Sequence, residues 1–275
     1  MRSWLYAVMV VGGVARATPV SDLEAQFRAA AENPYGHDMP DPRFALGNLD
    51  VRAGDDLSSA HTDLAGGDEV VDRVTIGLAG DGKSAWLAAD LRYVGDCGGD
   101  GPSCGKTLAT GHVGAVFERG TPWQPVVWNV SNTTTAKRQA EMIADGKQLA
   151  AIPDQIEGAD AAVGVFKASI GDPKALAASV SERKDTLLYG SADGERYTGA
   201  QVKAKLAAWK LAFKVHDGIR AGLAAGGTVA WVAANLDATA AGKPGKPTPY
   251  RALFVYEHEG TRWALVQAQF SFGGW

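Results

Sequence analysis

The sequence contains one stretch twice, as GLAGDGKSAWLAADL at residues 77–91 and as GLAAGGTVAWVAANL at residues 222–236. The two copies align without gaps, and most of their positions are identical. A second block follows each copy in the same order, VFERGTPWQPVVWNVS at residues 116–131 and VYEHEGTRWALVQAQFS at residues 255–271. A long period with only two copies indicates a duplicated domain rather than a solenoid.

Each copy has the pattern of an antiparallel meander. Runs rich in Val, Trp, Leu and Phe alternate with breaks rich in Gly, Pro and Asp, as strands and turns do. The second strand of each meander is expected to begin at Ser84 in the first copy and at Thr228 in the second. The connection to the third strand is longer in the first copy, because it contains the two cysteines. We therefore interpret the cysteine loop as an insertion in a hairpin connection.

Helical periodicity precedes the second meander. The spacing of apolar residues predicts helices over residues 159–170 and 199–213. Asp172 before Pro173 predicts the cap and first turn of a short helix between them, and residues 186–189 predict a short strand. Helices followed by an antiparallel sheet define an α+β fold.

The first copy is shorter at its front. Residues 21–31 predict a helix with Ser21 as its cap. Residues 33–69 are rich in Pro, Gly, Asp and Asn, and they contain no clear counterpart of the helix at 199–213.

The second copy, residues 159–273, resembles the SnoaL-like domain of the nuclear-transport-factor-two-like superfamily, whose fold is the cystatin-like cone. The resemblance lies in three segments: DTLLYGSADGERYTGAQVKAKLAAW, then GTVAWVAANLDA, then PYRALFVYEHEGTRWALVQAQFS. The first copy resembles the family only over residues 70–131. The resemblance implies two tandem cone-shaped domains, each with a curved antiparallel sheet wrapped around helices. Members of the family include small-molecule isomerases, dehydratases and cyclases, and also non-catalytic binding or dimerisation modules.

The length of 275 residues fits two domains of ordinary size. The expected boundaries are a signal peptide at 1–17, a degenerate first SnoaL-like domain at 18–131, a partly helical linker at 132–158 and a second SnoaL-like domain at 159–275.

The N-terminus has the features of an export signal. Arg2 supplies a positive charge, residues 4–15 are apolar, and Ala15-Arg16-Ala17 fits a cleavage site, which predicts a cut before Thr18. The alternative is a buried N-terminal helix or strand. Export implies a periplasmic or secreted protein. No later segment reaches the length of a membrane-spanning helix, so we expect no membrane span.

The two cysteines, Cys97 and Cys104, lie in the segment DCGGDGPSC. In an oxidising compartment, this spacing favours a disulfide that closes a short loop. A structural zinc site would need about two further ligands, and only His112 lies nearby. We therefore expect neither a metal site nor a cofactor.

The formal net charge is −4, with both signs mixed along the chain. Phosphate binding requires a basic face, so this balance argues against a nucleic-acid partner.

Residues 77–84, GLAGDGKS, also match the phosphate-loop pattern of Gly, four residues and Gly-Lys-Ser. That chemistry requires a helix to begin at Ser84, whereas the following AWLAADLRYV has the pattern of a strand. We interpret the segment as a hairpin with Asp81-Gly82 at its tip.

Ligand contact is predicted for the second domain by aromatic faces and a few polar groups, as in small-molecule sites. The candidates are Tyr189, Trp209, Trp231, Asn235, Tyr250, Gln267 and Gln269. Packing in the core is the competing interpretation for each tryptophan. Gln267 and Gln269 occupy the strand where many relatives carry a histidine, and glutamine transfers no proton at neutral pH.

No residue is therefore assigned a catalytic role, and a non-catalytic binding or interaction protein is favoured over an enzyme. The expected partner is a small apolar ligand or another protein, and the two sheets are expected to pair within the chain or in a homodimer. The alternative is a small-molecule lyase or isomerase that acts in the pocket of the second domain, with Asp237, Asp185 or His216 as the base.

Overall fold

The computed structural model describes residues 18–32, 42–46, 51–53, 67–95, 104–133, 149–240 and 246–272, together with residues 135, 137, 140 and 141. The predicted signal peptide, residue Cys97 and most of the predicted linker helix at 136–151 lie outside these residues. No helix in the described part of the chain is long and apolar enough to cross a membrane.

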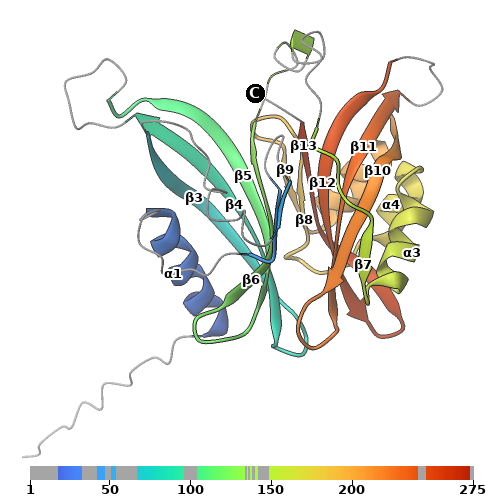
Figure 1. Cartoon of the computed structure of the whole chain (residues 1–275), viewed down its shortest axis with the longest axis horizontal. Coiled ribbons are helices and arrows are strands. Elements are labelled where there is room, and N and C mark those ends of the chain that lie inside the picture. Colours follow the sequence, from blue (N-terminus) through green and yellow to red (C-terminus); the bar gives the residue numbers. More distant parts are fainter. Residues whose placement is uncertain are drawn as a thin grey trace, which may run out of the picture.

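The first sheet has six strands in the order β2-β1-β6-β5-β4-β3 (Figure 1). Its strands are β1 (Phe44–Leu46), β2 (Val51–Ala53), β3 (Gly67–Leu78), β4 (Ser84–Gly95), β5 (Thr107–Glu118) and β6 (Gln124–Asn132). The last four form an antiparallel meander, β1 pairs with β6 in parallel, and β2 pairs with β1 in antiparallel orientation.

The second sheet has seven strands in the order β7-β10-β11-β12-β13-β8-β9. Its strands are β7 (Gln155–Glu157), β8 (Leu187–Tyr189), β9 (Arg196–Thr198), β10 (Leu211–Leu223), β11 (Val229–Ala240), β12 (Thr248–Glu259) and β13 (Arg262–Phe272). Here too the meander strands are antiparallel, the short strand β8 is parallel to the last of them, and β9 is antiparallel to β8. Apart from β7, the two sheets have the same strand order.

Helices cover the outer face of each sheet (Figure 1). The first sheet carries α1 (Pro19–Glu32), and the second carries α3 (Asp160–Ser169), α4 (Pro173–Ser179) and α5 (Ala200–Ala208). Leu23 and Phe27 of α1 enter the core of the first sheet, and Phe166 of α3 enters the core of the second. The α+β class expected from the sequence is confirmed.

The inner faces of the two sheets pack against each other. One buried apolar cluster contains residues of both sheets, including Trp86 and Val116 of the first and Trp231 and Val255 of the second. The rings of Phe44 and Trp231 stack across this contact with centroids 5.7 Å apart. Strand β4 is buried along most of its length because it is covered on both faces, which explains its nearly continuous apolar sequence.

The repeated stretch forms equivalent hairpins in the two sheets. In the first, β3 and β4 are joined by a turn in which the amide of Gly82 donates to the carbonyl of Ala79 at 2.9 Å. In the second, the amide of Gly227 donates to the carbonyl of Ala224 at 3.0 Å. A strand, not a helix, begins at Ser84, so the hairpin interpretation of GLAGDGKS is confirmed.

A glycine lies beneath the repeated tryptophan of each hairpin. Gly77 is the cross-strand neighbour of Trp86, and Gly222 is the neighbour of Trp231. A Cβ atom on Gly77 would lie 2.0 Å from the ring of Trp86, so only glycine leaves room for that ring. The repetition of Gly and Trp in both copies follows from this packing.

Hydrogen bonds also connect the first hairpin to the second sheet. The amide of Gly80 donates to Oε1 of Glu257 at 2.9 Å, and the hydroxyl of Ser84 donates to the carbonyl of Ala225 at 2.6 Å. These bonds connect residues far apart in the chain, so they fix the sheets relative to each other.

Three local predictions need correction. The helix predicted over 199–213 ends at Ala208, because Trp209 has an extended backbone, and Phe213 belongs to strand β10. Helix α1 begins at Pro19 rather than Ser21, and Thr18 precedes it with its hydroxyl accepting the amide of Ser21 at 3.2 Å. The segment 33–69, in which no element was predicted, contributes β1 and β2.

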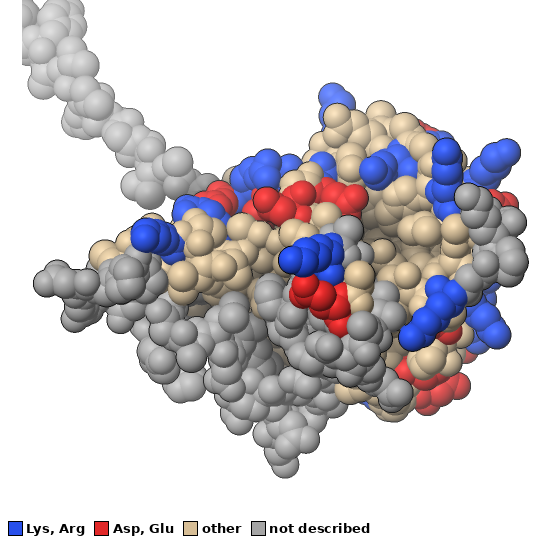
Figure 2. All heavy atoms as spheres, turned by 90° about the horizontal axis from the view of Figure 1, so that it is seen from above, with Lys and Arg blue, Asp and Glu red and all other residues tan. Residues whose placement is uncertain are grey.

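Acidic and basic side chains lie among each other on the face seen from above (Figure 2). This mixture agrees with the mixed charge pattern of the sequence.

Candidate functional site

Two of the predicted ligand residues lie under the helices of the second sheet. Trp209 packs edge-on against Phe270 with ring centroids 4.9 Å apart, and Tyr250 packs at 6.1 Å from Phe213. Both belong to an apolar cluster in which Phe166 and Phe254 are fully buried. Both residues therefore pack against the core between the sheet and the helices of this half.

The other five residues do not face that region. Trp231 lies in the cluster between the sheets, and the side chain of Asn235 donates to the carbonyl of Ala150 at 2.9 Å. Gln269 donates to the carbonyl of His112, and Gln267 lies beside it against the first sheet. The ring of Tyr189 packs at a tilt against His112 of the first sheet, with centroids 4.5 Å apart. The structure thus does not bring the seven residues together in one lining.

Of the three residues considered as bases, His216 and Asp237 are paired with each other, whereas Asp185 is paired with Arg183. His216 Nδ1 lies 3.0 Å from the carboxylate of Asp237, and the His216 side chain is 60 % exposed. The hydrogen bond to Asp237 raises the pKa of His216. Asp185 accepts two hydrogen bonds from Arg183, at 2.9 and 2.7 Å, so its carboxylate is already satisfied.

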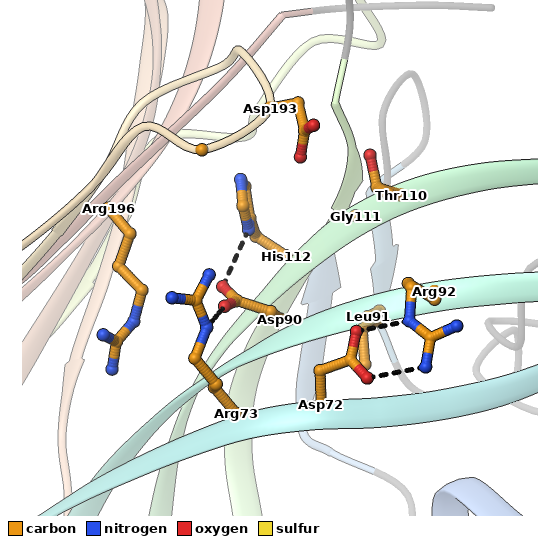
Figure 3. Close-up of a pocket in the computed structure, with 11 residues that line it drawn as sticks. Asp72, Arg73, Asp90, Leu91, Arg92, Thr110, Gly111, His112, Asp193 and Arg196 are labelled. Carbon is orange, nitrogen blue, oxygen red and sulfur yellow. Dashed lines mark hydrogen bonds and ion pairs between the residues drawn. The ribbon is translucent and has the colours of Figure 1, made fainter. Parts of the chain in front are cut away.

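A pocket of about 260 Å³ opens where the first sheet meets the turn between β8 and β9 (Figure 3). Strands β3, β4 and β5 supply one wall, and the turn at Asp193 and Gly194 lies opposite. The lining residues are Asp72, Arg73, Asp90, Leu91, Arg92, Thr110, Gly111, His112, Asp193, Gly194 and Arg196. Both halves of the chain therefore contribute to it.

Asp90 and His112 form the buried floor of the pocket. They are paired across β4 and β5, and both are less than one-tenth exposed. Nδ1 of His112 lies 3.4 Å from Oδ1 of Asp90, and Arg73 donates through Nε to the other carboxylate oxygen. Burial alone would raise the pKa of Asp90, but its interactions with His112 and Tyr189 and the charge of Arg73 outweigh burial and lower it. Asp90 is therefore a carboxylate at neutral pH.

The second half of the chain contributes Tyr189 and Arg196 to the site. Arg196 donates through Nε to the hydroxyl of Tyr189 at 3.0 Å and through Nη2 to the hydroxyl of Thr75. Burial raises the pKa of Tyr189, and the neighbouring charge of Asp90 acts in the same direction. The tyrosine is therefore a neutral hydroxyl, and the guanidinium of Arg196 lies beside it.

The carboxylate of Asp90 orients the ring of His112. Because Nδ1 faces Asp90, the ring is held with Nε2 directed toward the gap below the β8–β9 turn (Figure 3). Nε2 is buried and has no hydrogen-bond partner among the described residues. A ligand in the pocket would meet an imidazole nitrogen together with guanidinium donors. No three His, Cys, Asp or Glu side chains in the described part of the chain are placed to hold a metal ion.

Asp90 was not predicted as a site residue, and His112 was considered only as a neighbour of the cysteines. One signal was present: the repeated stretch has Asp90 where the second copy has Asn235. A charge difference inside an otherwise similar segment marks a position where the two halves diverge in chemistry.

Helices on one face of a curved antiparallel sheet place the second half among the α+β cones. Residues 166–273 match the sequence profile of the SnoaL-like domain, in agreement with the resemblance noted for residues 159–273. The match covers less than half of the 275 residues. No curated protein matches the sequence.

Solved structures with a similar fold cover about two-fifths of the chain. A candidate ketosteroid isomerase from Parabacteroides distasonis is 18 % identical, with 40 % of this chain and 84 % of that chain covered and a TM-score of 0.33. An NTF2-like protein of unknown function from Shewanella oneidensis is 18 % identical, with 41 % and 97 % covered and a TM-score of 0.31. An uncharacterised cystatin-like protein from Caulobacter vibrioides is 15 % identical, with 42 % and 90 % covered and a TM-score of 0.35.

Proposed function

We propose that the chain is an exported, non-catalytic binding protein made of two tandem SnoaL-like domains that pair through their sheets. The observation that carries the proposal is the aromatic packing inside the second domain, where Phe166, Phe254 and Phe270 are buried against one another. An enzyme of this fold needs an accessible acid or base inside the cone. Apolar packing between the sheet and the helices supports a scaffold role.

The duplication is supported by topology. Both sheets contain the same meander and the same short hairpin, whose first strand is parallel to the last meander strand. The equivalent Gly–Trp pairs, Gly77 with Trp86 and Gly222 with Trp231, occupy the same register. Shared register over two separate segments supports descent of both halves from one domain.

Export is supported by the position of helix α1 in the sequence. Helix α1 begins at Pro19, directly after the predicted cleavage site, and Thr18 supplies the polar residue that precedes it. The proposed disulfide between Cys97 and Cys104 fits the same compartment. The backbone of Cys104 forms an isolated parallel β-bridge with Gly95, at the end of β4.

The lyase or isomerase alternative has less support. Asp237 lies on the strand face opposite Leu236 and Ala238, which face the helices, so its side chain is directed away from the cone. Asp185 is held by Arg183 and is equally unsuited to proton transfer.

Native mass spectrometry of the protein purified from an exporting host tests the proposal. We expect a monomer that begins at Thr18 and retains a small molecule, which is released unchanged on denaturation. Fresh protein should leave the released compound unaltered over hours. Conversion of that compound, or a chain that carries no ligand and shows no partner, would refute the binding role.

A further inference from the structure

The repeated stretch places two polar pairs at equivalent positions. Asp90 and Asn235 occupy the same place in the two copies. Each faces its cross-strand partner in the third meander strand, which is His112 for Asp90 and Arg251 for Asn235. The same backbone geometry therefore presents two different sets of polar groups on the inner faces of the sheets.

In the second half, the chain itself fills the space in front of the pair. The carbonyl of Ala150 accepts hydrogen bonds from Asn235 at 2.9 Å and from Arg251 at 2.7 Å. Arg251 also donates to Oδ1 of Asn235 at 3.1 Å, and it is fully buried. A carbonyl oxygen from the predicted linker thus accepts a hydrogen bond from each member of this pair.

In the first half, no described segment takes the place of Ala150. The pair of Asp90 and His112 borders the 260 Å³ pocket instead, and Nε2 of His112 is buried without a partner in the described residues. A buried polar nitrogen left unpaired is costly, so the arrangement suits a group that arrives from outside.

The charges around the pocket indicate what that group is. Arg73 is neutralised by Asp90, and Arg92 by its two bonds to Asp72, at 2.6 and 2.8 Å. Within the described residues, Arg196 donates to the hydroxyls of Tyr189 and Thr75, which carry no charge. A half-buried guanidinium with neutral partners attracts an oxyanion.

The remaining acidic groups limit the charge of that oxyanion. Asp90 lies on the floor and the exposed Asp193 lies at the rim, so a dianion meets more repulsion than a monoanion does. The volume is below the range of about 300–1,000 Å³ that holds drug-sized ligands, so the ligand is small.

We propose that this pocket binds a small monocarboxylate beside His112, with its oxygens held by Arg196 and the outer nitrogens of Arg73. The inference rests on the proposed binding function and adds its site and its ligand class. In this arrangement, the carboxylate takes the place that the carbonyl of Ala150 occupies in the second half.

An NMR titration tests the proposal. The imidazole nitrogens of His112, assigned with a His112→Gln variant, are followed while acetate, lactate or benzoate is added, with lactamide as the uncharged match to lactate and inorganic phosphate as the dianionic oxyanion. We expect a saturable shift with at least one acid, no response to lactamide, and weaker binding of phosphate. Absence of a saturable response to all three acids overturns the proposal, as does equal binding of lactamide.

Variants locate the binding site. Arg196→Gln should weaken carboxylate binding roughly tenfold or more, because it removes a charge-assisted contact, and Arg196→Lys should restore part of it. Arg92→Gln is the matched control at the rim, since its bonds go to Asp72, and it should change the affinity less than about twofold. Thermal unfolding confirms that each variant is folded. Equal loss in Arg92→Gln and Arg196→Gln would place the anion elsewhere.

The outcome can be separated from that of the proposed function. If native mass spectrometry finds a retained ligand that Arg196→Gln does not release, the binding role stands and this site is wrong. If no ligand is retained and no acid binds, the binding role fails as well.

Discussion

Replacing Gly77 by alanine should destabilise the protein by about 3 kcal/mol, because overfilling a packed core costs roughly that much when a large side chain must move. The added Cβ atom would lie 2.0 Å from Cε2 of Trp86, and that ring is fully buried in the cluster between the sheets. No small rotation of the side chain relieves so close a contact.

Two other glycines provide matched controls. At Gly222 the nearest atoms of Trp231 lie 3.0 Å from an added Cβ, so a shift of a few tenths of an ångström suffices and the expected loss is about 1 kcal/mol. Gly164 is exposed within helix α3 and has nothing within 4 Å, so alanine there should stabilise the protein by about 0.5–1 kcal/mol.

Urea unfolding followed by tryptophan fluorescence measures all three variants. The midpoints should fall in the order Gly164→Ala, wild type, Gly222→Ala, Gly77→Ala, with unchanged slopes. A Gly77→Ala protein as stable as the wild type, or more stable than Gly222→Ala, would refute the packing account of the repeated Gly–Trp pair.

Three further predictions concern charge, covalent linkage and the contact between the sheets. The lowered pKa of Asp90 means that its carboxylate stabilises the fold above its unfolded pKa, and this contribution is lost as the pH falls through the folded value. Asp90→Asn should therefore cost about 1–3 kcal/mol at pH 7 and much less near pH 3, as measured by urea unfolding; a pH-independent cost would contradict this. Intact mass and thiol labelling without reductant should show Cys97 and Cys104 joined, and labelling of both would rule the disulfide out. The isolated segment 159–275 should dimerise or aggregate in light scattering, because removing the first half exposes Trp231 and Val255; a well-behaved monomer would argue against the shared core.

Much of the fold could be predicted because its signals are local. The two copies of the repeated stretch specify a hairpin each, and alternation within them specifies the strands. The helix over 199–213 was predicted too long because Trp209 and Phe213 satisfy helical spacing, although Phe213 also alternates with Leu211 and Val215 in strand β10. Strands β1 and β2 are three residues each and are stabilised by pairing with distant partners, which the sequence of that segment does not indicate.

The candidate site could not be predicted from either half alone. Asp90 and His112 come from the first sheet, whereas Tyr189 and Arg196 come from the short hairpin of the second. Their proximity depends on how the sheets pack, which has no periodic signature. Gln267 and Gln269 were assigned to a pocket by the resemblance, but their side chains lie between the sheets.

The covalent connection between the two sheets has a thermodynamic consequence. A contact between separate subunits weakens on dilution, because dissociation follows mass action. Here the surfaces around Trp86 and Trp231 belong to one polypeptide, so the effective concentration of one surface at the other is constant. The integrity of a pocket built from both halves therefore does not depend on how much protein is present, even at trace levels.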